Sequence, residues 1–203
     1  MGGDRRALKA MSTIAIFFAL LAAVGLAGVD RIVAAEVVPG AGSVWARGVA
    51  LVDLGMLRSI GIWLLPIIFV WAALILLVLR ATRGIGFPLL YLGFVHLFAF
   101  GAADLAGPRL GRVGPAEAAS GSDLWFASGN SFPSATAAFY AGFFFPLVLL
   151  FPRLWPLWVA PPLLVSASLV LTEGHYLSDV TASLALAATL AAALSFVAEK
   201  GRE

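Results

Sequence analysis

The chain has 203 residues, of which 62% are hydrophobic and only 12% are charged. Soluble domains carry roughly 25% charged residues, so this composition cannot cover a surface that faces water, and it predicts an integral membrane protein. The formal net charge of +2 gives no indication of a nucleic-acid partner. The absence of cysteine excludes disulfide bonds and thiol chemistry.

The charges leave six long uncharged segments, each near or above the roughly 20 apolar residues that span a bilayer. These segments are residues 10–29, 59–79, 84–103, 124–152, 154–172 and 180–198. They predict an all-α fold, a bundle of six transmembrane helices that forms a single domain over residues 1–203. The first segment also has the outline of a signal peptide, but its uncharged length exceeds the usual core of about 7–15 residues, so we interpret it as a helix.

The lysines and arginines gather on one side of the membrane if the six segments alternate in direction. Eight lie on the side of the two termini: Arg5, Arg6, Lys9, Arg80, Arg83, Arg153, Lys200 and Arg202. Five lie on the other side: Arg31, Arg47, Arg58, Arg109 and Arg112. Because cytoplasmic loops carry the excess of basic residues, we expect both termini in the cytoplasm of an inner or plasma membrane. The loops at 104–130 and 172–179 then lie together on the periplasmic or outer face.

Residues 30–58 form the longest segment on that outer side. After the Pro39-Gly40-Ala41-Gly42 break, residues 44–57 mix apolar side chains with Arg47 and Asp53. This pattern predicts a short interfacial helix between the first two transmembrane helices, with Trp45 at the level of the headgroups. Such a helix would either guide a lipid into a site or pack against the bundle.

The polar stretch 172–179 contains the strongest catalytic candidate. If the helix that follows begins near Gly174, His175 and Asp179 lie four residues apart on one helix face. The carboxylate would then bind one imidazole nitrogen, fix the tautomer and leave the other nitrogen available for nucleophilic attack or proton transfer. The alternative is a plain helix start, in which Asp179 caps the helix and His175 lies at the interface.

Two arginines indicate a phosphate site on the same face. Arg109 and Arg112 lie three residues apart in the Gly/Pro-rich stretch 107–115, and guanidinium groups bind phosphate oxygens bidentately. The alternative is a solvated loop whose arginines contact lipid headgroups.

The stretch 128–136 predicts the start of the fourth helix. Ser131 or Phe132 is placed to cap it, with Pro133 as the first helical residue. The amides of residues 134–136, including those of Ser134 and Thr136, would then be free to bind an anion at the positive end of the helix dipole. The alternative is a well-capped helix without a ligand.

His96 falls inside the third apolar segment. An ionisable side chain within the bilayer indicates function by default. The alternative is a neutral histidine that is hydrogen-bonded to a neighbouring helix.

Taken together, the three outward segments resemble the type 2 phosphatidic acid phosphatase superfamily of membrane lipid phosphatases. That family reads Lys-x6-Arg-Pro, then Pro-Ser-Gly-His, then Ser-Arg-x5-His-x3-Asp, on one face of a six-helix bundle. The matching stretches, the last of which is also similar to lipid A phosphatases, are Gly111-Arg112-Val113-Gly114-Pro115, Ser131-Phe132-Pro133-Ser134 and Gly174-His175-Tyr176-Leu177-Ser178-Asp179-Val180.

The resemblance is incomplete at four positions. The motif lysine falls at Gly107, the arginine before proline at Gly114, the second-motif histidine at Thr136 and the third-motif arginine at Leu169. Three cationic phosphate ligands and the proton-donating histidine are therefore absent from their expected places. His175, Asp179, Ser134 and Arg112 remain.

The resemblance implies that His175 attacks phosphorus and forms a phosphohistidine, that Asp179 orients its ring, and that no metal or other cofactor is required. Thr136 stands where the family has its general acid, and the loss of general-acid catalysis typically costs roughly 10²–10⁴ in rate. The loss of one arginine at a transferring phosphoryl group costs on the order of 10³–10⁵. The residues that would bind the phosphate are Arg109, Arg112, Ser131 and Ser134.

Two classes of function remain. One is a membrane lipid phosphatase or phosphotransferase that acts on a lipid phosphate or diphosphate at the outer face. The other is a non-catalytic relative that binds a lipid phosphate or serves as a partner or transport component. A third idea, an intramembrane serine protease that uses Ser131 with His175, leaves Asp179 and the arginines unexplained.

The absent general acid indicates which substrate an active site would favour. A phosphomonoester releases an alkoxide, which needs a proton, whereas a diphosphate releases a phosphate ester that is already a stable anion. We therefore expect a preference for a diphosphate such as an undecaprenyl or lipid A-type diphosphate.

Overall fold

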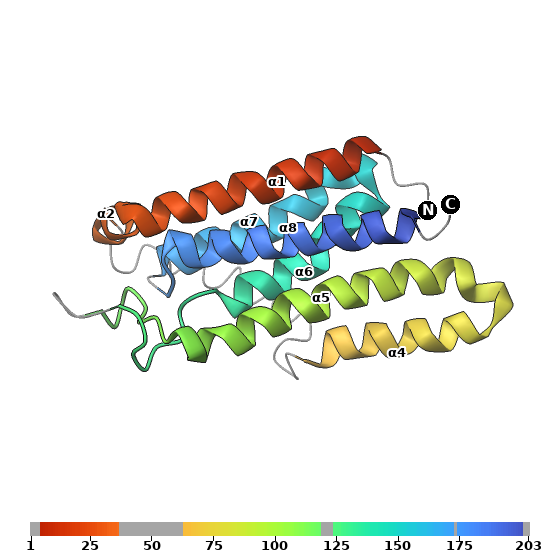
Figure 1. The fold of residues 1–203 in the computed structure, drawn as a ribbon, viewed down its shortest axis with the longest axis horizontal. Coiled ribbons are helices and arrows are strands. Elements are labelled where there is room, and N and C mark those ends of the chain that lie inside the picture. The colour runs from red at the N-terminus through yellow and green to blue at the C-terminus, as the bar shows by residue number, and fades with distance from the viewer. Residues whose placement is uncertain (1–4, 37–62, 119–123, 173, 201–203) are drawn as a thin grey trace.

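The computed structural model describes residues 5–36, 63–118, 124–172 and 174–200, and Figure 1 shows them as a bundle of long helices. In chain order the elements are α1 (Arg5–Val24), the π-helical turn η1 (Gly25–Val29), α2 (Asp30–Glu36), α4 (Leu64–Val78), the 3₁₀ turn η2 (Arg80–Thr82), α5 (Arg83–Leu110), α6 (Ala135–Leu150), the 3₁₀ turn η3 (Pro152–Leu154), α7 (Trp155–Leu171) and α8 (Leu177–Lys200). The six long helices run alternately up and down, so α1 begins and α8 ends at the same end of the bundle (Figure 1).

The all-α membrane fold predicted from the sequence is confirmed. In the described part of the chain, four helical stretches are long and apolar enough to cross a membrane, and α4 and α6 are shorter apolar helices. Large apolar side chains stay exposed on the outside of the bundle, among them Ile16, Leu20, Trp71 and Ile75. These side chains face lipid in a membrane-spanning bundle. The predicted interfacial helix at 44–57 lies outside the described residues.

Helix α5 extends beyond its predicted end. Its last turn includes residues 107–110, which the glycine and proline content indicated as loop, and it ends where Gly111 adopts a left-handed conformation with φ of 59°. The Gly111 amide donates to the carbonyl oxygen of Gly107 and closes the helix. A Cβ at Gly111 would lie 2.2 Å from the Ala127 carbonyl oxygen, so only glycine fits. Arg109 therefore lies on a helix and Arg112 lies beyond it.

Helix α6 begins later than predicted. Ser134 is its N-cap residue, because the Ser134 hydroxyl accepts a hydrogen bond from the Ala137 amide at 3.3 Å. Ser131 remains in the preceding loop, where its amide donates to the Arg112 carbonyl oxygen at 2.9 Å. The predicted cap at Ser131 or Phe132, with Pro133 as the first helical residue, is therefore wrong. The hydrogen bond from the Ser131 amide to Arg112, in the segment after α5, keeps Ser131 outside the helix and leaves Ser134 as the cap.

The core sits where α1, α5, α6 and α8 meet. Helix α1 packs along α8, α5 lies between α4 and α6, and α6 also contacts α7 and α8. The contacts are made mainly by small side chains with a few large ones, including Met11, Phe18, Val95, Ala99, Phe145, Leu184, Ala188 and Ala191. Small residues allow membrane helices to approach closely and gain van der Waals contact.

His96 lies fully buried between α5 and α6. Its ring centroid is 4.6 Å from that of Phe139, in an edge-to-face arrangement. Neither ring nitrogen has a hydrogen-bond partner among the described residues. A Cβ at Gly142 would lie 3.1 Å from the His96 Cα, so the absence of a side chain on α6 makes room for this packing. The expected hydrogen bond from His96 to a neighbouring helix is not formed within the described part of the chain.

Candidate functional site

The three segments that carry the sequence motifs meet at one end of the bundle. The segment after α5 is held to the segment before α6 by backbone hydrogen bonds from Val113 to Leu124 and from Ser131 to Arg112. The first turn of α8 joins them through the Ser134 amide, which donates to the Asp179 carbonyl oxygen at 3.2 Å. The Ser134 amide is therefore not free to bind an anion, contrary to the expectation from the sequence.

His175 is oriented mainly by the Ser131 carbonyl group. Its Nδ1 lies 2.9 Å from this oxygen, which can only accept, so Nδ1 carries the proton. In the neutral ring Nε2 then holds the lone pair and accepts a hydrogen bond from the Ser134 hydroxyl at 3.2 Å. This is the tautomer that a nucleophilic Nε2 requires. The His175 side chain is 16% exposed, so a ligand can reach the ring.

Asp179 lies behind the His175 ring, but not as the helical pattern predicted. Helix α8 begins at Leu177, so His175 precedes it. The Asp179 Oδ2 is 3.6 Å from the His175 Nδ1, which is longer than a hydrogen bond. The same oxygen accepts hydrogen bonds from the Tyr176 amide at 2.8 Å and from the Ser131 hydroxyl. Asp179 thus caps its own helix, as one alternative held, and it also places a negative charge beside the imidazole.

Arg112 is buried among carboxylates. Its guanidinium donates to Asp179 Oδ1 at 2.5 Å, to the Ser178 hydroxyl at 2.6 Å and to Asp30 Oδ2 at 2.7 Å. Its remaining nitrogen, Nε, is buried without a hydrogen-bond partner among the residues that the structure describes. The three charged side chains carry a net charge of −1, which a positively charged imidazolium ring at His175 would balance.

Aromatic rings enclose the same guanidinium. The Arg112 Cζ lies 4.3 Å from the ring centroid of Tyr176, 4.9 Å from that of Trp125 and 5.8 Å from that of Phe132. Cation–π attraction adds to the ion pairs in this water-poor setting. Burial raises the pKa of the Tyr176 phenol above its usual value of 10.0.

Asp30 is a site residue that sequence reasoning missed. It is buried at the start of α2 and accepts hydrogen bonds from the Ser178 amide at 2.9 Å and from the Ser178 hydroxyl at 2.5 Å. A negative charge at the first turn of α8 is favourable to the helix dipole. A Cβ at Gly25 would lie 2.7 Å from Asp30 Oδ1 and 2.9 Å from the Ser178 Cβ, so the glycine makes this approach possible. The sequence marked Asp30 only as the first acidic residue after the first apolar segment.

Arg109 and Thr136 lie on the two helices next to the site, α5 and α6. Arg109 is exposed on the last turn of α5 and donates to the Leu105 carbonyl oxygen of its own helix. Thr136 is half-buried in the first turn of α6. The structure brings Ser131, Ser134, His175 and Asp179 into direct contact, and it joins Arg112 to Asp179. Phosphate binding by Arg109 and Arg112 stays a prediction.

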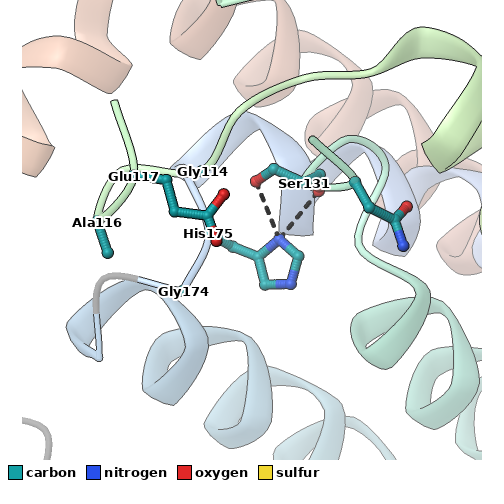
Figure 2. A pocket seen from close by; sticks show the side chains of 7 residues that line it. Gly114, Ala116, Glu117, Ser131, Gly174 and His175 are labelled. Carbon is teal, nitrogen blue, oxygen red and sulfur yellow. Dashed lines mark hydrogen bonds between the residues drawn. The ribbon is translucent and has the colours of Figure 1, made fainter. Parts of the chain in front are cut away.

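A cavity of about 250 Å³ opens beside His175, and Figure 2 shows its lining. It is lined by Gly114, Ala116, Glu117, Asn130, Ser131, Gly174 and His175. A Cβ at Gly114 would lie 3.3 Å from the Gly174 carbonyl oxygen and 3.7 Å from the Ser131 hydroxyl, so a longer side chain at 114 would enter this space. A Cβ at Gly107 would lie 1.8 Å from the Asn130 Oδ1, so the side-chain amide of Asn130 occupies the space that a side chain at position 107 would need.

The fold is that of an integral membrane protein with a polar site at one end of its helix bundle. The model of the PAP2 superfamily matches residues 88–202, more than half of the chain, and the chain belongs to this superfamily. The resemblance noted in the sequence is thereby confirmed. The matched residues begin within α5, so Asp30 and α1 lie outside them.

A solved structure with a similar fold is the transmembrane PAP2-type phosphatidylglycerolphosphate phosphatase from Bacillus subtilis. It is 21% identical in sequence, the match covers 94% of this chain and 96% of that one, and the TM-score is 0.55. At this identity the likeness shows the fold. No curated protein is similar enough to the chain to add to these findings.

Proposed function

We propose that this protein is a membrane lipid phosphatase or phosphotransferase that works through a phosphohistidine at His175. The observation that carries the proposal is the state of this ring: the Ser131 carbonyl oxygen holds the proton on Nδ1, and Nε2 keeps its lone pair beside a cavity. A histidine held in this way is suited to attack phosphorus.

The chemical steps follow from the contacts. The Nε2 lone pair forms a bond to phosphorus while the bond from phosphorus to the leaving oxygen breaks. The ring becomes positive, and the net negative charge of the Asp30–Arg112–Asp179 group stabilises it. Water, or the hydroxyl or phosphate of a second lipid, then takes the phosphoryl group and restores the neutral ring. The Ser134 hydroxyl is placed to donate to a phosphate oxygen once Nε2 is engaged.

The leaving group decides the substrate within this proposal. With threonine at position 136, an alkoxide leaves without a proton from the family's general acid. A diphosphate linkage, as in an undecaprenyl or lipid A-type diphosphate, avoids this requirement. The distribution of basic residues supports a site on the periplasmic or outer face with both termini in the cytoplasm. The proposed unit is the whole chain, residues 1–203.

The experiment compares the purified protein on a lipid monophosphate and a diphosphate with the same lipid chain. We expect faster release of phosphate from the diphosphate, a phosphoenzyme that is absent from His175→Ala, and a gain on the monophosphate in Thr136→His. Faster monophosphate hydrolysis by the native protein, with no gain from Thr136→His, contradicts the substrate preference. Full turnover by His175→Ala contradicts the mechanism.

A non-catalytic relative is the second candidate, and the charges of the site favour it. Arg112 is engaged by two carboxylates, and the described lining of the cavity contains no lysine or arginine. A protein of this kind would bind lipid phosphate without turnover. Inactivity on both lipids by a folded protein that still binds them selects this function.

A further inference from the structure

We propose that the cavity beside His175 selects a lipid headgroup that carries an ammonium group next to its phosphate. This inference rests on the proposed function, since it names the substrate class of the same site. Glu117 is the specificity-determining residue. The ammonium pairs with its carboxylate, while the phosphate lies against His175.

The described lining of the cavity has a charge opposite to that expected of a plain phosphate site. It includes the Glu117 carboxylate and no cationic side chain apart from the titratable imidazole of His175. Figure 2 shows the Glu117 side chain extending from the segment of Gly114 toward His175. A carboxylate in this position repels a phosphate dianion and attracts a cation.

Glu117 is held in place and is available to a ligand. It lies in a turn that is closed by hydrogen bonds from the Glu117 and Ala118 amides to the Gly114 carbonyl oxygen, at 3.2 and 3.0 Å. Its side chain is exposed, and within the described part of the chain it forms no ion pair. Among the described residues, no cation competes with a substrate ammonium for this carboxylate.

Within the described part of the chain, neither Arg112 nor Arg109 replaces that ammonium. Arg112 is closed off by Asp30, Asp179 and three aromatic rings. Arg109 does not line the cavity. Gly114 lines it, but contributes only backbone. Among the described residues that line the cavity, no lysine or arginine supplies the positive charge that balances a bound phosphate, and a substrate ammonium supplies it.

The size of the cavity agrees with a headgroup. Its volume of about 250 Å³ lies just below the roughly 300–1,000 Å³ of pockets that enclose drug-sized ligands. An aminoalkyl phosphate fits this space, and the rest of the lipid stays outside. The ammonium and the diphosphate linkage have separate roles. The ammonium balances the negative charge of the headgroup, and the diphosphate linkage provides a stable leaving group.

The test measures binding at His175 directly. The chain has two histidines, and His96 is fully buried, so the imidazole NMR signals of labelled protein give one responsive ring and one internal reference. The ligands are O-phosphoethanolamine and n-propyl phosphate, which have similar size and differ by an ammonium in place of a methyl group. All titrations contain EDTA, so that a divalent ion cannot replace the ammonium.

We expect the native protein to bind O-phosphoethanolamine about two- to fivefold more tightly than propyl phosphate, as one partly exposed ion pair allows. Glu117→Gln should remove this preference. The matched control Glu36→Gln, which changes an exposed carboxylate at the end of α2 that does not line the cavity, should keep it. Equal affinities in the native protein, absence of binding by both ligands, or an unchanged preference in Glu117→Gln would overturn the proposal.

A second variant adds to the protein the positive charge that the substrate ammonium would otherwise supply. Gly114→Arg places a guanidinium in the cavity and should raise the affinity for propyl phosphate about tenfold while reducing the preference for the ammonium ligand. An affinity for propyl phosphate that does not rise in a folded Gly114→Arg protein contradicts the inference.

The failure of this inference can be told from failure of the proposed function. If O-phosphoethanolamine is preferred but no lipid gives a phosphoenzyme, headgroup selection stands and catalysis is excluded. If a phosphoenzyme forms without any preference for the ammonium, catalysis stands and the role of Glu117 is excluded.

Discussion

Replacement of Arg112 by alanine tests whether the buried charge group is structural. Arg112 is 3% exposed and lies 2.7 Å from Asp30 Oδ2 and 2.5 Å from Asp179 Oδ1. Arg112→Ala leaves two buried carboxylates close together with no cation between them. Breaking a buried ion pair by removing one partner costs about 3–5 kcal/mol. At about 2–4 °C per kcal/mol for a chain of this length, the unfolding midpoint should fall by roughly 6–20 °C.

The measurement is thermal unfolding in detergent at neutral pH, followed by circular dichroism. Arg109→Ala is the matched control, because it removes the same side chain three positions earlier from an exposed site, and it should leave the transition in place. The double variant Arg112→Ala/Asp30→Asn should recover part of the loss, since one of the two unpaired charges is gone. Equal midpoints for Arg112→Ala and Arg109→Ala would refute the reasoning and return Arg112 to the role of a phosphate ligand.

Three further predictions follow from the fold and the site. Because the chain has no cysteine, single cysteines can be placed at Ser128 and at Arg153, at opposite ends of the bundle. An impermeant maleimide applied to intact cells should label Ser128→Cys and not Arg153→Cys, and labelling of both disproves the topology. Ser134→Ala removes the N-cap of α6 and the hydroxyl on His175 Nε2, so it should cost about 0.5–2 kcal/mol in unfolding free energy and also shift the imidazole NMR signal of His175. An unmoved signal contradicts the contact. Burial raises the pKa of Tyr176 above 10.0, so the neutral phenol contributes stability that is present below about pH 10 and lost as the pH rises through the folded-state pKa. Tyr176→Phe should therefore show a flatter decline in unfolding midpoint between about pH 9 and 11, a range that brackets the usual phenol pKa. A decline parallel to that of the native protein argues against a buried phenol.

The sequence predicted the helices because the bilayer imposes a length and an apolar composition on each. It placed His175 and Asp179 near each other because both residues lie in one short polar stretch, but the expected hydrogen bond between them is not formed. Helix ends were less certain. The stretch 131–134 holds a serine on either side of Phe-Pro, and the tertiary hydrogen bond from the Ser131 amide to Arg112 selects Ser134 as the cap.

Local sequence patterns could not predict which of the two arginines is buried. Arg109 and Arg112 looked equivalent in a Gly/Pro-rich stretch, but α5 continues to Leu110 and the chain turns at Gly111. One arginine therefore faces outward and the other is buried. Asp30, the partner of Arg112, lies 82 residues earlier in the chain, and no periodic pattern connects the two.

The spread of the charge group along the chain has a consequence for biogenesis. Asp30 is synthesised first, Arg112 follows 82 residues later and Ser178 148 residues later. At about 5–20 residues per second, Asp30 waits roughly 4–16 s for its cation and roughly 7–30 s for the helix start that it caps. An unpaired carboxylate is costly in lipid, so the end of the first helix must stay hydrated at the membrane surface during this interval. Helix α8 therefore completes the burial of Asp30 at the end of the first apolar helix.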